Sequence, residues 1–270
     1  MRPFRNIWML EEIGQPYNHI VCKPWSRVAK SVHPLGKVPA LLVENYSCQP
    51  SSSSNDNNNN NDRFVIIESA AINTFLGDLT RIPTNNEKND IPSSTSILLV
   101  PPPGTPLRAK YDSIAMFIMT ELDSQSLWIH RKHEALSNVF GDAPIAVQEA
   151  KRQFDNALDV IVDEIVVGDD GNEEVGYLLP TGFSAVDIIF ANCCFWAQQI
   201  DWLEKSSDTK SNTSTTSSNE QNDNHDDAKK ITPKLATYLQ NCRARSAFVK
   251  ANELRRNQVY EKKESHTSKL

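Results

Sequence analysis

The spacing of apolar residues divides this chain into a short mixed region and a long helical one, and the mixed region comes first. Apolar side chains recur at helical spacing over residues 5–13, and Gly14 ends the predicted helix. Residues 17–22 alternate between apolar and polar positions, a pattern that favours a strand. Two apolar runs, at residues 40–43 and 64–67, flank a polar tract like the arms of a hairpin with an enlarged turn. The pattern predicts a small α/β domain.

Helical spacing returns after these runs and continues almost to the C-terminus. Glu68 and Ser69 open one predicted helix, which runs to Leu79 and for which Ser69 fits the N-cap. Beyond a segment rich in Pro, Ser, Thr and Asn, the apolar pattern is helical in period. The predicted helices there cover residues 107–122, 125–140, 145–167 and 183–203, with a break between the first two. We therefore expect an all-α C-terminal helical bundle domain.

Two helices of this second domain have specific start signals. Ser184 precedes Asp187 by three positions, which is a capping box with Asp in place of Glu. Phe183 and Ile188 occupy the flanking hydrophobic-staple positions. Thr232 precedes a proline, as an N-cap does when proline takes the first helical position. The helix that follows Ser184 is the most apolar, so we expect it at the buried centre of the domain.

Composition sets the boundaries between the domains. Two tracts, one of Ser and Asn and one of Ser, Thr, Asn and Asp, cannot bury enough apolar surface to offset the entropy of ordering them. We expect both to be disordered surface insertions. The predicted organisation is an N-terminal domain at 1–82 with an insert at 49–62, a linker at 83–106, a C-terminal domain at 107–256 with an insert at 206–230, and a tail at 257–270.

Charge, hydropathy and cysteine usage exclude several classes of protein. The 28 basic and 34 acidic residues give a formal net charge of −6, without the concentrated basic stripe that nucleic acid requires. No apolar run approaches the roughly 20 residues that cross a bilayer. The five cysteines show no CxxC spacing, which indicates reduced thiols in the cytosol. We expect a cytoplasmic protein that binds neither nucleic acid nor a membrane.

A metal site is also not expected. His130 and His133 lie three positions apart on a predicted helix, with Glu134 beside them, and this spacing turns both imidazoles to one face. No third ligand is identifiable, and packed or solvated histidines explain the pattern more simply. Cys193 and Cys194 lie on the most apolar predicted helix and fit small core residues.

Two features near the predicted hairpin carry the candidate chemistry. Pro39 stands just before a strand, and a cis Val38–Pro39 bond would leave the backbone N–H and C=O of Val38 free to pair with an extended peptide. Glu68 and Ser69 stand at a helix start, where unpaired N–H groups, the hydroxyl and the helix dipole can hold a carboxylate. Glu68 can pair with an ammonium group, although Ser69 alone fits a plain N-cap equally well. Together these residues predict a site for a ligand with a free α-amino acid end.

The same residues resemble the glutathione S-transferase family. The order and spacing of three segments are those of the family's thioredoxin-like domain, apart from the Asn-rich insert: residues 5–17, 34–41 and 68–72. In the second domain, the capping box at 184–187 and residues 120–133 and 244–248 also resemble family segments. The resemblance implies a truncated α/β thioredoxin-like N-terminal domain followed by an all-α helical bundle.

The resemblance also implies roles for single residues. Val38, before the expected cis proline Pro39, would pair with the cysteinyl backbone of glutathione. Glu68 and Ser69 would bind the γ-glutamyl end, and Lys37 would add an anion contact.

Three residues of the second domain lie on helices that, by resemblance, wall the pocket for the electrophile. They are Tyr111, Met119 and Trp128. Each fits equally well as an ordinary core residue.

The chain departs from the family at its start. Family members begin with a strand, and a Ser, Tyr or Cys at or just after its end hydrogen-bonds the glutathione sulfur and lowers its pKa. Here a helix is predicted from Arg5 onward, and no residue before it carries a hydroxyl or a thiol. We expect the strand and its catalytic residue to lie upstream of Met1, in a sequence that is incomplete. The alternative is a degenerate domain that has lost activity.

The leading hypothesis is a glutathione transferase that conjugates glutathione, as co-substrate, to electrophilic small molecules without a metal. The resemblance also implies a homodimer. Two alternatives stay open: a non-catalytic binding or dimerisation module of the same fold, and a glutathione-dependent thiol reductase with a cysteine at the missing position.

Overall fold

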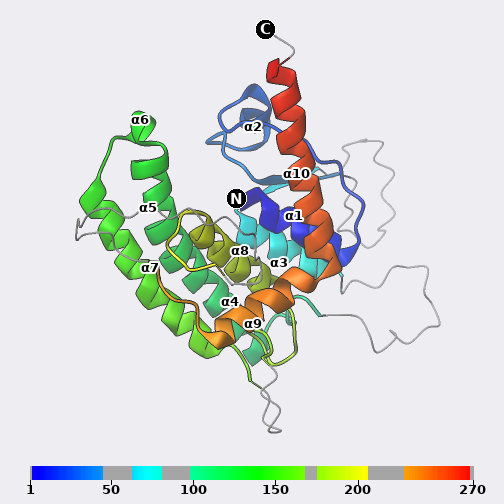
Figure 1. Cartoon of the computed structure of the whole chain (residues 1–270). Coiled ribbons are helices and arrows are strands. Elements are labelled where there is room, and N and C mark those ends of the chain that lie inside the picture. Colours follow the sequence, from blue (N-terminus) through cyan, green and yellow to red (C-terminus); the bar gives the residue numbers. More distant parts are fainter. Residues whose placement is uncertain (1, 45–62, 81–97, 168–174, 206–227, 268–270) are drawn as a thin grey trace, which may run out of the picture. The chain divides into compact units, whose positions relative to one another are not determined.

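The computed structural model of the chain describes residues 2–44, 63–80, 98–167, 175–205 and 228–267, with side chains to residue 257 in the last segment. Figure 1 shows the described helices and strands, coloured along the sequence. The chain divides into two compact units. Unit 1 comprises Met1–Val100 with Ser246–Leu270, and unit 2 comprises Pro101–Arg245. The predicted insert at 49–62, most of the insert at 206–230 and most of the linker lie outside the described residues.

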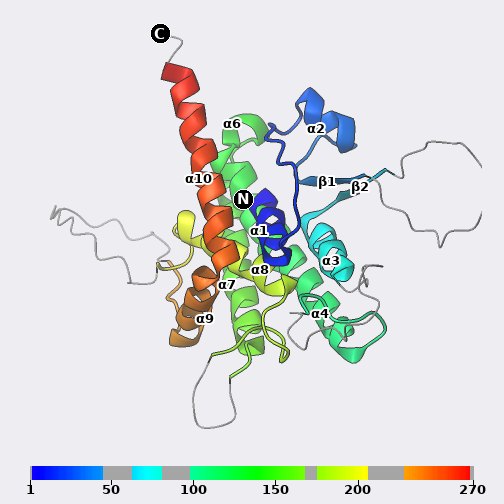
Figure 2. The same ribbon diagram turned by 90° about the vertical axis from the view of Figure 1, so that its right-hand side faces the viewer.

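Unit 1 combines a two-stranded antiparallel sheet with helices, as the sequence predicts for an α/β domain. Figure 2 shows the two strands side by side. Its described elements are α1 (Arg2–Ile13), α2 (Arg27–Val32), β1 (Ala40–Val43), β2 (Phe64–Ile67), α3 (Ser69–Leu79) and α10 (Ser246–Thr267).

Helix α1 is the centre of unit 1, because both α3 and α10 pack against it. Trp8 is fully buried, and its ring centre lies 4.9 Å from that of Phe248 on α10 in an edge-on contact. Phe4 makes a second edge-on contact with Phe248 at 5.6 Å. Such aromatic pairs bury a large apolar area and fix the helices against each other.

Within the described residues, the sheet consists of the two strands of one hairpin. Ala40 pairs with Ile67 and Val43 pairs with Phe64, as expected for the arms of an enlarged hairpin. The strand predicted over residues 17–22 is wrong, because that segment has irregular backbone. Alternation gives a strand its two faces, but strand geometry also needs a partner to accept its hydrogen bonds, and no described strand lies beside this segment. Ile20 is 68% exposed as a result.

The regular secondary structure of unit 2 is helical over the residues that the structure describes, apart from isolated bridges, as the sequence predicts. No described helix is both long and apolar enough to cross a membrane. The elements of unit 2 are α4 (Pro106–Phe117), π-helix η1 (Ile118–Leu127), α5 (Trp128–His130), π-helix η2 (Arg131–Ala135), α6 (Ser137–Phe140), α7 (Pro144–Glu164), α8 (Ala185–Gln199) and α9 (Pro233–Ala244).

The break predicted between residues 122 and 125 is absent, and a widened helix takes its place. The Trp128 N–H donates to the carbonyl of Asp123, five residues earlier, as in a π-helix. Asp123 and Ser126 are both fully buried, and the Ser126 hydroxyl donates to the Glu121 carbonyl at 2.6 Å. These polar residues imitate a turn in the sequence, but in the structure they face inward within one continuous helical run.

Helix α8 occupies the buried centre of unit 2, which confirms the expectation from its composition. Its start is organised by the fully buried Asp187. One carboxylate oxygen accepts from the Leu178 N–H at 2.9 Å and from the Tyr238 hydroxyl at 2.9 Å. The other accepts from the N–H and the hydroxyl of Ser184 at 2.8 and 2.7 Å. Burial raises the pKa of Asp187 above its usual value, although all four donors oppose the rise.

Replacing Asp187 by Asn tests this arrangement. Asn has one acceptor oxygen instead of two, so Asp187→Asn leaves buried donors unpaired and should lower the free energy of unfolding by about 2–4 kcal/mol. Tyr238→Phe removes a single donor and should cost about 1 kcal/mol. Denaturant titration measures both, and equal costs would contradict the account.

The raised pKa of Asp187 also predicts how the stability of the wild type and of Asp187→Asn depends on pH. Because the folded pKa of Asp187 is raised, the native state holds its proton more tightly than the unfolded state. The stability that this residue contributes is therefore complete below the unfolded carboxyl pKa of about 3.9 and falls as the pH rises through the folded value. Asp187→Asn should lose that dependence.

Gly77 on α3 is required by a close approach inside unit 1. A Cβ atom at this position would lie 2.3 Å from Cγ2 of Val100 and 3.2 Å from Cε of Met9. Gly77→Ala should therefore lower the free energy of unfolding by about 1–3 kcal/mol, although alanine is the better helix former. In a Val100→Ala background the penalty should shrink, because the clashing methyl group is gone. An unchanged penalty, measured by a double-mutant cycle, would refute this explanation.

Candidate functional site

Four of the residues that the sequence assigns to glutathione directly adjoin the paired ends of the hairpin strands: Val38, Pro39, Glu68 and Ser69. The Val38–Pro39 bond is cis, as the hypothesis requires. Because Ala40 pairs with Ile67, continuing the antiparallel register carries Pro39 and Val38 toward Glu68 and Ser69. Val38 is half-buried, and no backbone hydrogen bond joins it to another residue in the described part of the chain. Its N–H and C=O therefore stay available to an extended ligand.

Glu68 takes the N-cap position of α3, so the prediction that Ser69 is the N-cap is wrong. Glu68 has φ 70° and ψ 120°, a conformation that residues with a side chain rarely adopt, and it makes no side-chain capping bond. Ser69 is the first helical residue and is 2% exposed, whereas Glu68 is exposed. The pair thus offers an acid at the surface and a hydroxyl in buried surroundings.

The first turn of α3 has unpaired backbone donors. The first described helical bond of α3 runs from the Ile72 N–H to the Glu68 carbonyl at 3.0 Å. No described residue accepts from the N–H groups of Ser69, Ala70 and Ala71. Unpaired N–H groups and the positive end of the helix dipole favour an anion at this point.

Two residues of α1 hold this turn, and the sequence analysis did not single them out. Arg5 is fully buried, and its Nη1 donates to Ser69 Oγ at 3.4 Å. The Asn6 amide donates to the Ser69 carbonyl at 2.9 Å and to Asn73 Oδ1 at 2.7 Å. The only signal in the sequence is a pair of polar residues within an apolar helix. Their partners lie more than 60 positions away, so local pattern could not identify them.

Lys37 is exposed at the end of a fixed turn that leads into Val38. Gly36 adopts φ 59°, and its carbonyl accepts from the Trp25 N–H at 2.6 Å. A Cβ at Gly36 would lie 3.2 Å from the Trp25 Cα, so the turn needs glycine. The position of Lys37 at the mouth of the site remains a prediction.

The three residues assigned to the electrophile pocket lie in unit 2. Tyr111 on α4 is fully buried. Met119 on η1 and Trp128 on α5 are half-buried, and Lys132 Nζ lies 5.9 Å from the centre of the Trp128 ring. Their role toward an electrophile remains a prediction.

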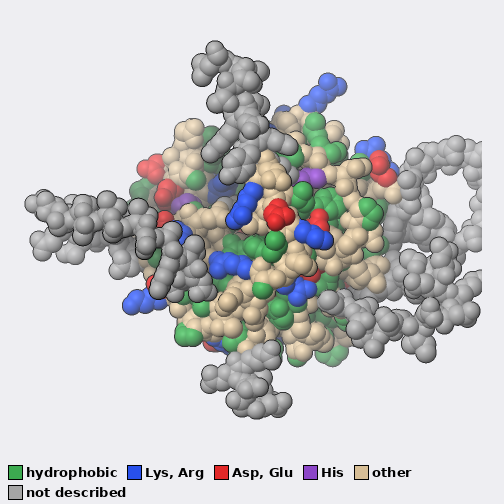
Figure 3. Space-filling view, turned by 45° about the vertical axis from the view of Figure 1, so that its right-hand side comes forward, with side chains coloured by type: hydrophobic (Ala, Val, Ile, Leu, Met, Phe, Trp, Pro, Cys, Tyr) green, Lys and Arg blue, Asp and Glu red, His purple; other side chains and the backbone are tan. Residues whose placement is uncertain are grey.

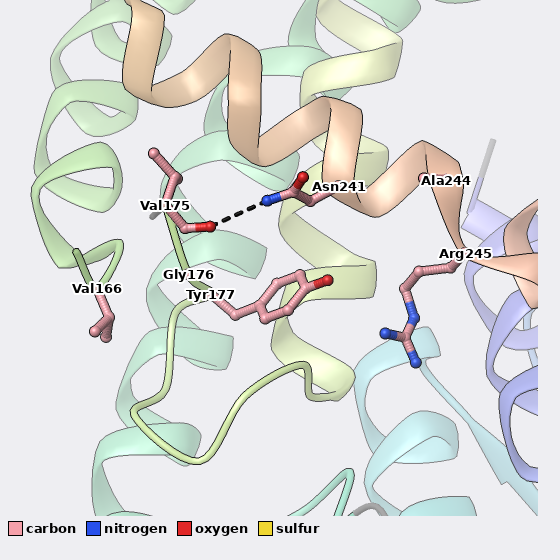
Figure 4. A pocket seen from close by; sticks show the side chains of 7 residues that line it. All are labelled: Val166, Val175, Gly176, Tyr177, Asn241, Ala244 and Arg245. Carbon is pink, nitrogen blue, oxygen red and sulfur yellow. Dashed lines mark hydrogen bonds between the residues drawn. The ribbon is translucent and has the colours of Figure 1, made fainter. Parts of the chain in front are cut away.

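Unit 2 also contains an open hollow of about 560 Å³, which none of the residues assigned from the sequence lines (Figure 4). The Asn241 amide donates to the Val175 carbonyl on its wall at 3.0 Å. Arg245 lies over the Phe183 ring, with 3.7 Å between Cζ and the ring centre. Burial raises the pKa of Tyr177, which is hydrogen-bonded to Arg245. Arg245 thus already contributes to packing within this unit.

The histidines considered as metal ligands have separate partners. His130 Nε2 lies 3.4 Å from Glu134 Oε2, and burial lowers the pKa of His130. His133 Nδ1 lies 2.9 Å from the Gly141 carbonyl oxygen. In the described ranges, no three His, Cys, Asp or Glu side chains are grouped as they would be around a metal ion. Figure 3 shows Lys and Arg scattered among acidic and apolar side chains on one face.

Comparison with known families agrees with the geometry at the hairpin. Residues 3–79 match the model of the glutathione S-transferase N-terminal domain. Residues 3–79 of this chain therefore form a domain of the glutathione S-transferase N-terminal type. The match contains all five residues assigned to glutathione: Lys37, Val38, Pro39, Glu68 and Ser69. The comparison with curated proteins gives no match.

Solved structures extend the glutathione transferase fold over nearly the whole chain. The glutathione transferase URE2P8 from Phanerochaete chrysosporium, solved with oxidized glutathione, has a TM-score of 0.59 at 17% identity and covers 96% of this chain and 93% of its own. A glutathione transferase from Methylococcus capsulatus has a TM-score of 0.58 at 18% identity, and the match covers 94% of each chain. A glutathione transferase homolog from Lodderomyces elongisporus with two GSH per subunit has a TM-score of 0.60 at 12% identity, and the match also covers 94% of each chain. Identities this low show the fold alone. The predicted fold class, an α/β N-terminal domain plus a helical domain, is confirmed.

The strained backbone of Glu68 generates a test of its own. Glycine adopts positive φ without a side-chain clash, so Glu68→Gly should raise the free energy of unfolding by about 1 kcal/mol. Glu68→Gln keeps the strain and should leave stability almost unchanged. Thermal and denaturant unfolding compare the two variants, and a Glu68→Gly protein less stable than Glu68→Gln would refute the strain.

Proposed function

We propose that this protein binds glutathione at the end of the hairpin and transfers it to electrophilic small molecules. The observation that carries the proposal is the start of α3, where an exposed acid, a serine hydroxyl and unpaired N–H groups adjoin the half-buried Val38–Pro39 segment. A γ-glutamyl end has an ammonium and a carboxylate on one carbon, and Glu68 and the helix tip are complementary to these two groups.

The fold comparisons support a ligand of this class. The structures from Phanerochaete chrysosporium and Lodderomyces elongisporus are described with oxidized glutathione and with GSH. In the proposal, Val38 pairs with the cysteinyl backbone, Glu68 and Ser69 bind the γ-glutamyl end, and Lys37 adds an anion contact. Tyr111, Met119 and Trp128 contact the electrophile.

In a displacement, the glutathione thiolate forms a bond to an electrophilic carbon as the bond to the leaving group breaks. In an addition, the thiolate bonds to one carbon of a polarised double bond, and the neighbouring carbon takes a proton from solvent. Both reactions give a thioether. The described residues contribute binding and orientation, which bring the two reactants together. The group that lowers the pKa of the glutathione sulfur is not assigned to a residue of this chain. The proposal includes a homodimer, which the family resemblance implies, and a cytoplasmic location, which the reduced thiols expected from the cysteine spacing support.

Calorimetric titration of the full chain with glutathione tests the binding step. Glu68→Gln and Ser69→Ala should each weaken binding by about tenfold, because each removes one charge-assisted hydrogen bond. Glu253→Gln and Ser246→Ala, at exposed positions on α10, serve as matched controls and should leave the affinity unchanged. Equal affinities for site and control variants would place glutathione elsewhere.

A second assay separates transfer from binding. A chromogenic electrophile reports thioether formation by its change in absorbance in the presence of glutathione. A protein that binds glutathione but never forms the thioether would be a binding module. Reduction of a mixed disulfide without conjugation would favour the thiol reductase.

A further inference from the structure

We infer that Arg5 is a positioning residue, which directs the Ser69 hydroxyl proton outward and so commits the start of α3 to a carboxylate. The inference rests on the proposed function and adds to it the residue that decides which end of the ligand is bound there.

The direction of the hydrogen bond carries this inference. A guanidinium group has donors and no acceptor, whereas a serine hydroxyl has one donor and two lone pairs. Arg5 Nη1 donates to Ser69 Oγ at 3.4 Å, so Ser69 is the acceptor and its proton must point away from Arg5. No described residue accepts a hydrogen bond from the Ser69 hydroxyl.

The same helix that contacts the Ser69 hydroxyl also holds the Ser69 backbone. Ser69 is the first residue of α3, and the Asn6 amide holds its carbonyl at 2.9 Å. Arg5 and Asn6 are neighbours on α1, which the Phe248 contacts fix against α10. The backbone and the side chain of Ser69 are therefore held from the same helix.

The surroundings select an anion as the partner of the hydroxyl. The outward proton adds to the unpaired N–H groups of Ser69, Ala70 and Ala71, and all of these groups donate. The positive end of the helix dipole acts in the same direction. Because Ser69 is only 2% exposed, water screens these interactions weakly. A carboxylate satisfies the donors, whereas a carboxamide offers one oxygen and a competing NH₂ group.

The experiment compares two probes by calorimetry on the full chain. One is glutathione, and the other is the analogue whose γ-glutamyl α-carboxylate is replaced by a carboxamide. The wild type should prefer glutathione by about tenfold or more. Arg5→Met removes the donor and should reduce that preference to about threefold or less, and Arg5→Lys, which can still donate, should restore part of it. Arg27→Lys, at an exposed position on α2, is the control and should change nothing.

A double-mutant cycle separates positioning from a general structural effect. If Arg5 acts through Ser69, Ser69→Ala should lose the same preference, and Arg5→Met should then cause little further loss. Additive losses would overturn the inference, as would an Arg5→Met protein that retains the wild-type preference. Unfolding curves are recorded for every variant. Should Arg5→Met fail to fold, the cycle is run with Arg5→Lys, whose preference must fall between those of the wild type and Ser69→Ala.

The two proposals fail in different ways. A wild type that does not bind glutathione overturns both. A wild type that binds glutathione, with a preference that Arg5 variants leave intact, overturns only the role of Arg5.

Discussion

The contact between α1 and the first turn of α3 is the constraint on which the candidate site depends. Arg5 donates to the side chain of Ser69 and Asn6 donates to its carbonyl, so the first turn of α3 cannot move without breaking buried hydrogen bonds. Buried polar groups are costly unless they are paired, which makes this contact specific as well as stabilising. The aromatic packing of α1 on α10 also holds α1 in place.

Much of unit 1 and unit 2 could be predicted because local patterns set local structure. Helical spacing located α1, α3 and α8, and the Ser184–Asp187 spacing located the start of α8. Two apolar runs located both arms of the hairpin, and the register then followed from their antiparallel pairing. The cis form of the Val38–Pro39 bond was expected from the position of Pro39 before a strand and from the family resemblance.

What the sequence could not predict depends on partners far along the chain. Serine is a residue type common at N-caps, but the Ser69 hydroxyl accepts from Arg5, 64 positions earlier. Asp123 and Ser126 are of residue types common in turns, but both are buried within unit 2 and belong to a π-helix. Residues 17–22 have the alternation of a strand, but alternation does not supply a neighbouring strand. In each case tertiary context overrides a correct local preference.

Two helix starts in this protein meet the same physical requirement in different ways, and the difference points to ligand binding. At α8, a buried carboxylate from the chain itself, Asp187, accepts from the N–H and the hydroxyl of Ser184. At α3, the N-cap residue is Glu68, which is exposed and makes no capping bond, whereas the N-cap Ser184 of α8 accepts from the Asp187 N–H. The Glu68 backbone also adopts a strained conformation. The first-turn donors of α3 have no acceptor among the described residues, and under the proposed function the carboxylate of the ligand accepts from them.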